Sequence, residues 1–287
     1  MDQARMPVRG DVMPTLAGHL DLTCARDANG RSYLREQSFS APFHISKPYW
    51  DGDALLLQLA SPTPGLFGGD RLTSSVTLDE GARLRIITPS AGRAHTMNGD
   101  GAELRQTFRL ARGARLEFCP APFIPQRLSR YRQSADISID QGGELLLLET
   151  IAPGRVAHGE SFRYKAIDWE CNVTYAGRLV LRERFVLEPD SPAFAAMKQP
   201  FPLGHYASAC VISEAAWADG SWVEKINAIQ SDDIRIGASR LVAAGWSIKL
   251  LAADSLALRR ATHQLRQALT RFFPAQDHQS RIFGFNH

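Results

Sequence analysis

Hydrophobic and polar residues alternate along much of the first two thirds of the chain. Leu104, Gln106, Phe108 and Leu110 share one side of an extended backbone, and the residues between them, which are charged or carry a hydroxyl, share the other. Alternation with a period of two is typical of a strand with one buried face. The pattern therefore predicts that residues 15–190 form mainly β-strands.

Turns of one form, Gly-x-x-Leu, separate several of these strands. The turns begin at the following glycines: Gly81, Gly101, Gly113 and Gly142. Glycine readily adopts the positive φ that a tight turn needs, and the leucine then starts the next strand on its buried side.

An aliphatic residue stands three positions before three of these glycines. These residues are Leu78, Leu110 and Ile139, so the spacing is 32 and then 29 residues. A loose period of this length is typical of stacked β layers, as in a solenoid. A series of ordinary hairpins with similar turns is the alternative, and the sequence does not separate the two. The predicted fold class is mainly β, with stacked, solenoid-like (β-helix-like) layers.

The character of the chain changes near residue 190, where prolines become frequent. We expect short strands over residues 203–253, with one short helix near residues 222–229. One long helix is predicted over residues 254–273, because Asp254 can cap its start, Pro274 follows its end and apolar residues recur at three- and four-residue steps. The chain is thus divided into a flexible N-terminus, a β-rich body, a mixed α/β C-terminal part packed on that body, and a tail. Their bounds are residues 1–14, 15–190, 191–280 and 281–287.

Composition narrows the classes of function. A net charge of +3, spread along the chain, is too small to predict binding to nucleic acid. A membrane-spanning helix needs about 20 apolar residues in succession, and the longest apolar run, residues 241–253, is interrupted by Gly245 and Lys249. No two of the four cysteines form a CxxC pair, which argues against a structural zinc site. We expect four separate reduced thiols in a cytoplasmic protein.

Residues 61–71 form the first stretch with candidate chemistry. Gly68 and Gly69 allow the backbone to fold tightly, so that Asp70 can accept amide hydrogen bonds and Arg71 can bind a carboxylate. A rigid hairpin loop with an internal Asp–Arg pair is the plainer interpretation.

Residues 148–162 form the second stretch. It holds two carboxylates, Glu149 and Glu160, with His158 two residues before the second. Oxygen and imidazole ligands suit nickel or another divalent ion. The plainer interpretation is a solvated loop with exposed charges.

Five segments, in this order, resemble the UreD (UreH) family of urease accessory proteins. They are residues 65–72 (GLFGGDRL), 83–93 (RLRIITPSAGR), 116–125 (LEFCPAPFIP), 154–162 (GRVAHGESF) and 237–250 (GASRLVAAGWSIKL). The resemblance covers roughly residues 15–275. Residues 61–64 depart from it, because they lack the first glycine pair of the family loop.

The resemblance implies a non-enzymatic scaffold with a mainly β fold. It implies binding to the accessory proteins UreF and UreG and to the urease apoprotein, and delivery of nickel through a water-filled passage. No tightly bound cofactor is expected, only transient nickel(II). The family motifs supply Gly68, Gly69, Arg71, Gly154, Arg155 and Gly159 as candidate loop residues, and Asp70, Glu149, Glu160 and His158 as candidate nickel contacts. The alternatives are a carbohydrate-active enzyme on a β-solenoid and a β interaction module without a metal role.

The predicted C-terminal helix carries a basic face opposite its apolar stripe. Arg259, Arg260 and Arg266 fall on that face, and the aromatic Phe283 follows in the tail. Arginine is enriched at protein interfaces because its planar guanidinium pairs with carboxylates through two hydrogen bonds. We therefore expect these residues to contact a partner, with a solvated basic face as the alternative.

Overall fold

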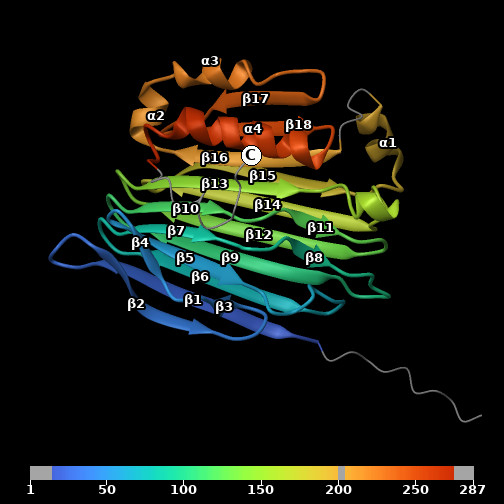
Figure 1. The fold of residues 1–287 in the computed structure, drawn as a ribbon, viewed down its shortest axis with the longest axis horizontal. Coiled ribbons are helices and arrows are strands. Elements are labelled where there is room, and N and C mark those ends of the chain that lie inside the picture. The colour runs from blue at the N-terminus through green and yellow to red at the C-terminus, as the bar shows by residue number, and fades with distance from the viewer. Residues whose placement is uncertain (1–14, 200–203, 275–287) are drawn as a thin grey trace, which may run out of the picture.

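A computed structural model of the chain describes residues 15–199 and 204–274 (Figure 1). The predicted flexible N-terminus, residues 1–14, and the predicted tail with Phe283 lie outside these ranges. Among the described residues, no helix combines the length and the apolar character that crossing a membrane requires.

Two β-sheets pack against each other. The seven-stranded sheet has the order β15-β14-β12-β9-β6-β1-β2. Its strands are β1 (Ala17–Arg26), β2 (Ser32–Phe39), β6 (Arg71–Leu78), β9 (Ala102–Leu110), β12 (Arg130–Ile139), β14 (Ala166–Tyr175) and β15 (Arg178–Leu187). The eleven-stranded sheet has the order β17-β18-β16-β13-β10-β7-β5-β3, with β4, β8 and β11 paired at its margins. Its strands are β3 (His44–Ile45), β4 (Tyr49–Asp51), β5 (Ala54–Ala60), β7 (Arg83–Ile87), β8 (Gly92–Ala94), β10 (Arg115–Cys119), β11 (Phe123–Pro125), β13 (Glu144–Ile151), β16 (His205–Ile212), β17 (Ile234–Arg240) and β18 (Gly245–Ala252).

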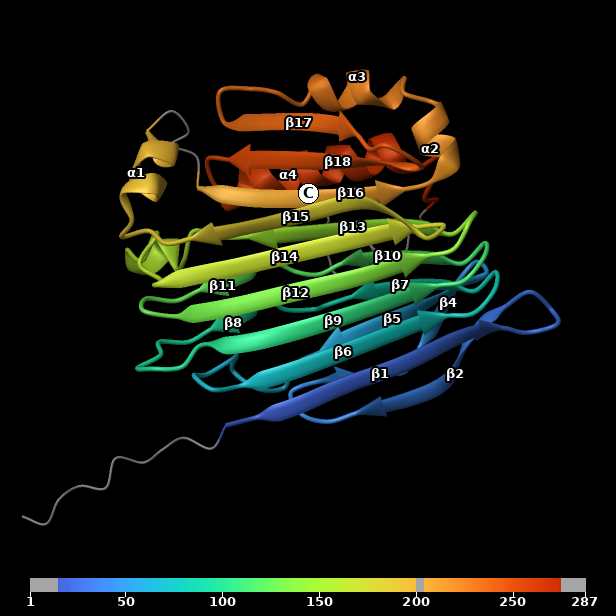
Figure 2. The same ribbon diagram turned by 180° about the vertical axis from the view of Figure 1, so that it is seen from behind.

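The chain crosses between the two sheets at nearly every turn of its central part. From β5 to β14 it alternates between them, except that β8 follows β7 and β11 follows β10 within one sheet, and neighbouring strands within each sheet run parallel. Each pair of strands therefore forms one layer that stacks on the layer before it, as Figures 1 and 2 show. This arrangement confirms the predicted solenoid-like fold. The hairpin alternative is wrong, because the turns join strands that belong to different sheets and are not hydrogen-bonded to each other.

The repeated turns stack in register at one end of the layers. Leu78 lies beside Leu110 and Leu110 beside Ile139 in the sheet, as their spacing in the sequence predicts. The glycines that follow them have positive φ values of 66–76°: Gly81, Gly113 and Gly142. The Gly81 amide donates to the Arg112 carbonyl of the next turn at 3.0 Å, so each turn is bonded to its neighbour.

Gly101 does not belong to this set of turns. It precedes β9 at the opposite end of the layers, and its φ is not positive. A Cβ atom at this position would lie only 2.9 Å from the Arg130 carbonyl oxygen. Glycine is required here by the close approach of a neighbouring backbone and not by turn geometry.

Antiparallel strands flank the main parallel run of each sheet. In the seven-stranded sheet, β2 pairs antiparallel with β1 and β15 with β14. In the eleven-stranded sheet, β3 and β4 close one side of β5, and β16 reverses direction beside β13.

The C-terminal part continues the eleven-stranded sheet through β16, β18 and β17. Two helices, α3 (Trp222–Asn227) and α4 (Ser255–Leu269), cover the outer face of these strands, as Figures 1 and 2 show. The predicted long helix is confirmed: the Asp254 carboxylate accepts the Ala257 amide at 2.7 Å and caps its start. The helix ends four residues earlier than predicted, since the amides of Phe272 and Phe273 both donate to the Leu269 carbonyl and tighten the chain into turns.

The structure adds two short helices that the sequence pattern did not predict: α1 (Pro192–Lys198) and α2 (Glu214–Ala218). Each is capped by a serine, Ser191 or Ser213, whose hydroxyl accepts an amide of the first turn. Helices of this length are too short to show an apolar periodicity.

A buried group of charges joins three strands on the outer face of the eleven-stranded sheet. Arg85 donates to Asp51, and its Nη2 lies 2.8 Å from a Glu117 carboxylate oxygen. The same Nη2 donates to the Pro274 carbonyl at 3.1 Å. All three charged side chains are at least 95% buried, so Arg85 holds the end of the described chain against the sheet.

All four cysteines are free thiols, as predicted. Cys24, Cys171 and Cys210 are buried and Cys119 is half-buried, and burial raises the pKa of each thiol above its ordinary value.

Candidate functional site

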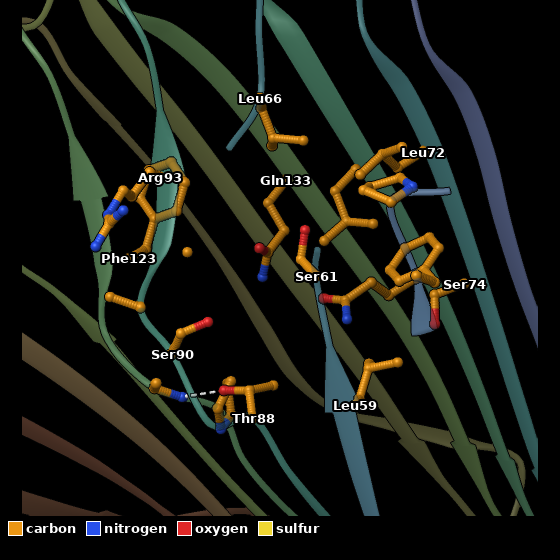
Figure 3. A pocket seen from close by; sticks show the side chains of 18 of the residues that line it. Leu59, Ser61, Leu66, Leu72, Ser74, Thr88, Ser90, Arg93, Phe123 and Gln133 are labelled. Atoms are coloured by element: carbon orange, nitrogen blue, oxygen red, sulfur yellow. Dashed lines mark hydrogen bonds between the residues drawn. The ribbon is translucent and has the colours of Figure 1, made fainter. Parts of the chain in front are cut away.

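A cavity of about 230 Å³, lined mainly by apolar residues, lies between the two sheets, at the end of the layers opposite the stacked glycine turns. We call it the inter-sheet cavity. Its inner walls combine apolar residues with hydroxyl and amide side chains: Ser61, Ser74, Thr88, Ser90, Gln106 and Gln133. Figure 3 shows Gln133 and Ser61 near its centre, with Phe123 and Arg93 at one side. Burial of a polar side chain costs free energy unless that side chain forms a hydrogen bond with another group of the protein or with a ligand.

Glu149 is the one carboxylate among the described residues that line this cavity. It belongs to β13, and its side chain receives hydrogen bonds from Gln133 Nε2 at 2.5 Å and from Trp169 Nε1 at 3.1 Å. Gln133 and Trp169 lie on neighbouring strands of the opposite sheet, so the carboxylate bridges the two sheets. Burial raises the pKa of Glu149 to about 7, and the two hydrogen bonds only partly oppose this effect. The plainer interpretation of this stretch, a solvated loop with exposed charges, is therefore wrong for Glu149.

A second carboxylate, that of Glu183, is separated from Glu149 by a small void. Glu149 and Glu183 both line this void, and Glu183 also faces an open groove on the far side, where it pairs with Lys249. Tyr206 donates its hydroxyl to the other oxygen of Glu183 at 3.1 Å. Glu149 thus stands between the inter-sheet cavity and a polar cluster that reaches the surface.

The mouth of the inter-sheet cavity is built by the first family-like loop. The amide of Leu66 donates to the Arg93 carbonyl, and the Phe67 ring stacks on His95 with ring centres 4.6 Å apart. Gly65 has a φ of 143°, and a Cβ atom there would lie 2.7 Å from the Arg93 carbonyl oxygen. The loop connects β5 of one sheet with β6 of the other, so it is not the hairpin that the plainer interpretation expected.

Asp70 fixes the fold of this loop. Its buried carboxylate accepts the Leu16 amide at 2.9 Å through one oxygen and the Phe67 amide at 2.8 Å through the other. These are amide hydrogen bonds of the kind predicted for Asp70. The Gly69 φ of 89° and the close approach of Gly68 to the Asp100 carbonyl allow the tight backbone.

Arg71 contacts neighbouring main chain and a carboxylate. Its guanidinium donates to the carbonyls of Asp70 and Gly101 and lies 3.6 Å from Glu103. The plainer interpretation, which expected an ion pair between Asp70 and Arg71, is therefore wrong, because the Asp70 carboxylate accepts hydrogen bonds from backbone amides.

The second family-like loop, residues 154–162, is held by an internal ion pair. Both oxygens of Glu160 receive guanidinium hydrogen bonds from Arg155, at 2.8 and 2.5 Å, and this pairing lowers the pKa of Glu160. Gly154 has a φ of 140°, and a Cβ atom there would lie 2.0 Å from the Glu160 carbonyl oxygen. Gly159 has a φ of 69° and ends a short 3₁₀ helix, Val156–His158. The motif glycines are thus explained by backbone geometry.

A surface groove of about 1000 Å³ lies between this loop and α4. We call it the helix groove. It brings together His158 and Arg155 from the loop with Arg259 and Arg266 from the helix, residues that the sequence placed in separate candidate sites. Arg266 also lies 3.5 Å from the buried Glu117. Arg260 does not line the groove, although it is exposed on the same helix.

The inter-sheet cavity and the helix groove share part of their walls. Ala91, Arg93, Pro120 and Thr150 line both. The Thr150 hydroxyl is buried and has no hydrogen-bond partner within the described part of the chain. A polar atom without a partner therefore lies at the boundary between the two spaces.

The four candidate nickel contacts are not gathered at one point. Glu149 lines the cavity, His158 lines the groove, and Asp70 and Glu160 line neither. Over residues 15–199 and 204–274, no three His, Cys, Asp or Glu side chains are placed to hold one metal ion together.

Sequence reasoning missed the partners of Glu149, which are Gln133 and Trp169. A signal was present, since Glu149 continues the row of Leu145 and Leu147 on one face of a strand whose other face, with Leu146 and Leu148, is also buried. An acid in phase with inward leucines predicts a buried carboxylate.

Comparisons with known proteins identify the family. A family model described as UreD urease accessory protein matches residues 16–282. A urease accessory protein UreD from Opitutus terrae is 40% identical over 264 residues, which cover 90% of this chain and 96% of that protein. A second, from Mycolicibacterium gilvum, is 30% identical over 273 residues, covering 92% and 98%. The order of the five sequence segments, the stacked two-sheet fold and these matches agree, and the chain belongs to the UreD family of urease accessory proteins.

Proposed function

We propose that this chain is a non-catalytic scaffold of urease maturation that passes nickel(II) toward the urease apoprotein through its inter-sheet cavity. Membership of the UreD family supports the role in urease maturation. The passage of nickel is inferred from the chemistry of the cavity.

The observation that carries the proposal is the position of Glu149. A cation that moves through a protein needs oxygen ligands that are favourable enough to admit it and weak enough to release it. One carboxylate among neutral hydroxyl and amide oxygens fits this need, whereas several carboxylates around one point would trap the ion. Glu149 is the one carboxylate among the described residues that line the cavity, its neighbour Gln133 is a neutral amide, and the remaining lining is mainly apolar apart from hydroxyl and amide side chains and Arg93 at one side.

Next to Glu149 in the sequence, Thr150 also lines the cavity; its buried hydroxyl has no hydrogen-bond partner among the described residues and offers a further oxygen ligand. On the other side of Glu149, the route continues toward Glu183 and the surface. Nickel is transient cargo on this route and not a resident cofactor.

The scaffold role requires partners. We propose that the chain bridges the urease apoprotein to proteins of the UreF and UreG type, and that the exposed face of α4 with Arg259, Arg260 and Arg266 takes part. This role implies a cytoplasmic location, and the four free thiols support it.

The test compares Glu149→Gln with a matched control, Glu170→Gln. Glu170 lies on β14 next to Trp169, but its side chain faces the opposite side of the sheet. We expect deletion of the chain to abolish urease activation while urease protein levels are unchanged. We expect Glu149→Gln to lower the nickel content and activity of urease several-fold, and Glu170→Gln to leave both unchanged.

Purified variants should be melted alongside these measurements. Full activation of urease without the chain would disprove the scaffold role. Normal nickel loading with a folded Glu149→Gln variant would disprove only the route through the cavity.

A further inference from the structure

The helix groove is basic, although the chain as a whole is nearly neutral. Four arginines and three histidines line it, and no aspartate or glutamate does so within the described ranges. The whole chain carries 33 lysines and arginines against 30 acids. The positive charge of the groove is therefore a local feature and not a consequence of composition.

One buried histidine at the groove has an unused polar atom. His205 is 93% buried, lines the groove and leaves Nδ1 without a hydrogen-bond partner among the residues that the structure describes. Burial lowers the pKa of this imidazole, so its neutral form is favoured. A buried nitrogen without a partner costs free energy that a bound polar group would recover.

Aliphatic side chains stand on opposite sides of the same groove. Val156, from the loop, is 51% exposed, and Leu256, from the first turn of α4, is 62% exposed. The groove floor between them includes Leu148, Leu258 and Ile124. Basic and apolar surfaces combined in one open groove fit a protein segment better than a nucleic acid, whose backbone would gain nothing from the aliphatic rim.

The size of the groove also favours a protein segment over a small molecule. Its volume of about 1000 Å³ stands at the upper limit of small-molecule sites, which are about 300–1,000 Å³. Two of its arginines already have carboxylate partners within the chain, Arg155 with Glu160 and Arg266 with Glu117. The positive charge of the groove is therefore partly neutralised and is distributed along its length, and it is not concentrated at one anion-binding site.

We propose that the helix groove binds a segment of a partner protein that is rich in acidic residues and in leucine. Carboxylates of that segment pair with Arg93 and Arg259, and its aliphatic side chains contact Val156 and Leu256. Arginine suits this role because its guanidinium pairs with a carboxylate through two parallel hydrogen bonds. The inference rests on the proposed scaffold role for the existence of a partner, but it does not depend on the passage of nickel.

The test uses the full-length chain and a fluorescein-labelled synthetic peptide in which glutamate and leucine alternate. Binding is measured by fluorescence anisotropy at low and at physiological salt, without urease or nickel. We expect saturable binding that Arg259→Glu weakens about tenfold, which corresponds to about 1.4 kcal/mol. The matched control is Arg178→Glu, the same charge reversal at an exposed arginine on β15 outside the groove, and it should change the affinity by less than about twofold.

A second variant keeps the test informative if Arg259→Glu does not fold. Leu256→Asp changes an exposed side chain on the groove rim, and it should also weaken the peptide at least about tenfold while its melting temperature stays unchanged. A peptide with lysine in place of glutamate should not bind.

Three results would overturn the inference. They are no measurable binding of the acidic peptide at low salt, equal effects of Arg259→Glu and Arg178→Glu, and preferential binding of a DNA duplex over the peptide. None of these results bears on whether deletion of the chain abolishes urease activation, so failure of this inference is distinguishable from failure of the scaffold role.

Discussion

Gln133 Nε2 donates a hydrogen bond of 2.5 Å to Glu149 Oε1 across the interior, and so joins a strand of one sheet to a strand of the other. Both partners are more than 90% buried. The donor is neutral, as is Trp169 on the second carboxylate oxygen. Neutral donors stabilise a carboxylate less than a cation does, and burial therefore sets the direction of the pKa shift.

The first prediction concerns pH. Burial raises the pKa of Glu149 from 4.5 to about 7, so the folded chain keeps a proton in this window that the unfolded chain has released. Stability falls with rising pH wherever the folded state binds more protons. The contribution of Glu149 is therefore fully present below pH 4.5 and is lost as pH rises through about 7, by about 3 kcal/mol at most.

Glu149→Gln cannot titrate, and we expect its free energy of unfolding to depend less steeply on pH across this window. Urea denaturation at a series of pH values measures the slope. Other groups titrate equally in both proteins and cancel in the comparison. Parallel curves for the variant and the wild type would show that Glu149 is ionised in the folded chain throughout.

The second prediction concerns the buried charges around Arg85. Arg85→Ala leaves Asp51 and Glu117 buried without their main cation, and we expect a loss of about 3–5 kcal/mol in the free energy of unfolding. Arg83→Ala is the control, because the pair of Arg83 with Asp53 is partly exposed and should contribute about 1 kcal/mol or less. Denaturation midpoints for the two variants give the answer, and similar losses would contradict the special role of Arg85.

The third prediction concerns the stacked turns. Gly113 has a φ of 66°, and Gly113→Ala places a Cβ atom in the left-handed region, which costs about 1–2 kcal/mol. Gly237→Ala in β17 is the matched change, since that glycine has no positive φ and no atom within 4 Å of a built Cβ. We expect Gly113→Ala to lower the melting temperature. We expect Gly237→Ala to change the free energy of unfolding by no more than about 0.5 kcal/mol.

The fourth prediction concerns Asp70. Asp70→Ala removes the acceptor for the amides of Leu16 and Phe67, and each lost hydrogen bond leaves a donor at a cost of about 1–3 kcal/mol. We expect thermal stability and urease activation to fall together in this variant. Loss of activation with an unchanged melting curve would instead assign Asp70 a direct role toward nickel.

The layered part of the fold could be predicted because its signal is local and repeated. The spacing of Leu78, Leu110 and Ile139 becomes a row of neighbours in the seven-stranded sheet. Gly101 shared the sequence form of the turns but not their geometry, since a Gly-x-x-Leu pattern does not distinguish a positive φ from a close backbone approach. The choice between hairpin and solenoid depended on which sheet each strand joins, and that is a long-range property.

The site was harder to predict for the same reason. Glu149 was grouped with Glu160 and His158 because they are close in the sequence, yet the sheet carries Glu149 into the interior. Its partners, Gln133 and Trp169, lie 16 and 20 positions away in the chain. The helix groove shows the converse, because Arg155 and Arg259 are about a hundred residues apart and line one surface.

The antiparallel strands that bound each parallel run decide how this molecule meets copies of itself. A stack of parallel layers exposes at each end the hydrogen-bonding pattern that the next layer would need, and a second molecule could continue it as a fibre. Here the strands at those ends run the other way, with β2 at one and β15 at the other. A layer from another copy cannot continue the parallel pattern past these strands, and β2 and β15 could pair with another chain only through the reversed hydrogen-bonding pattern of their own open edges.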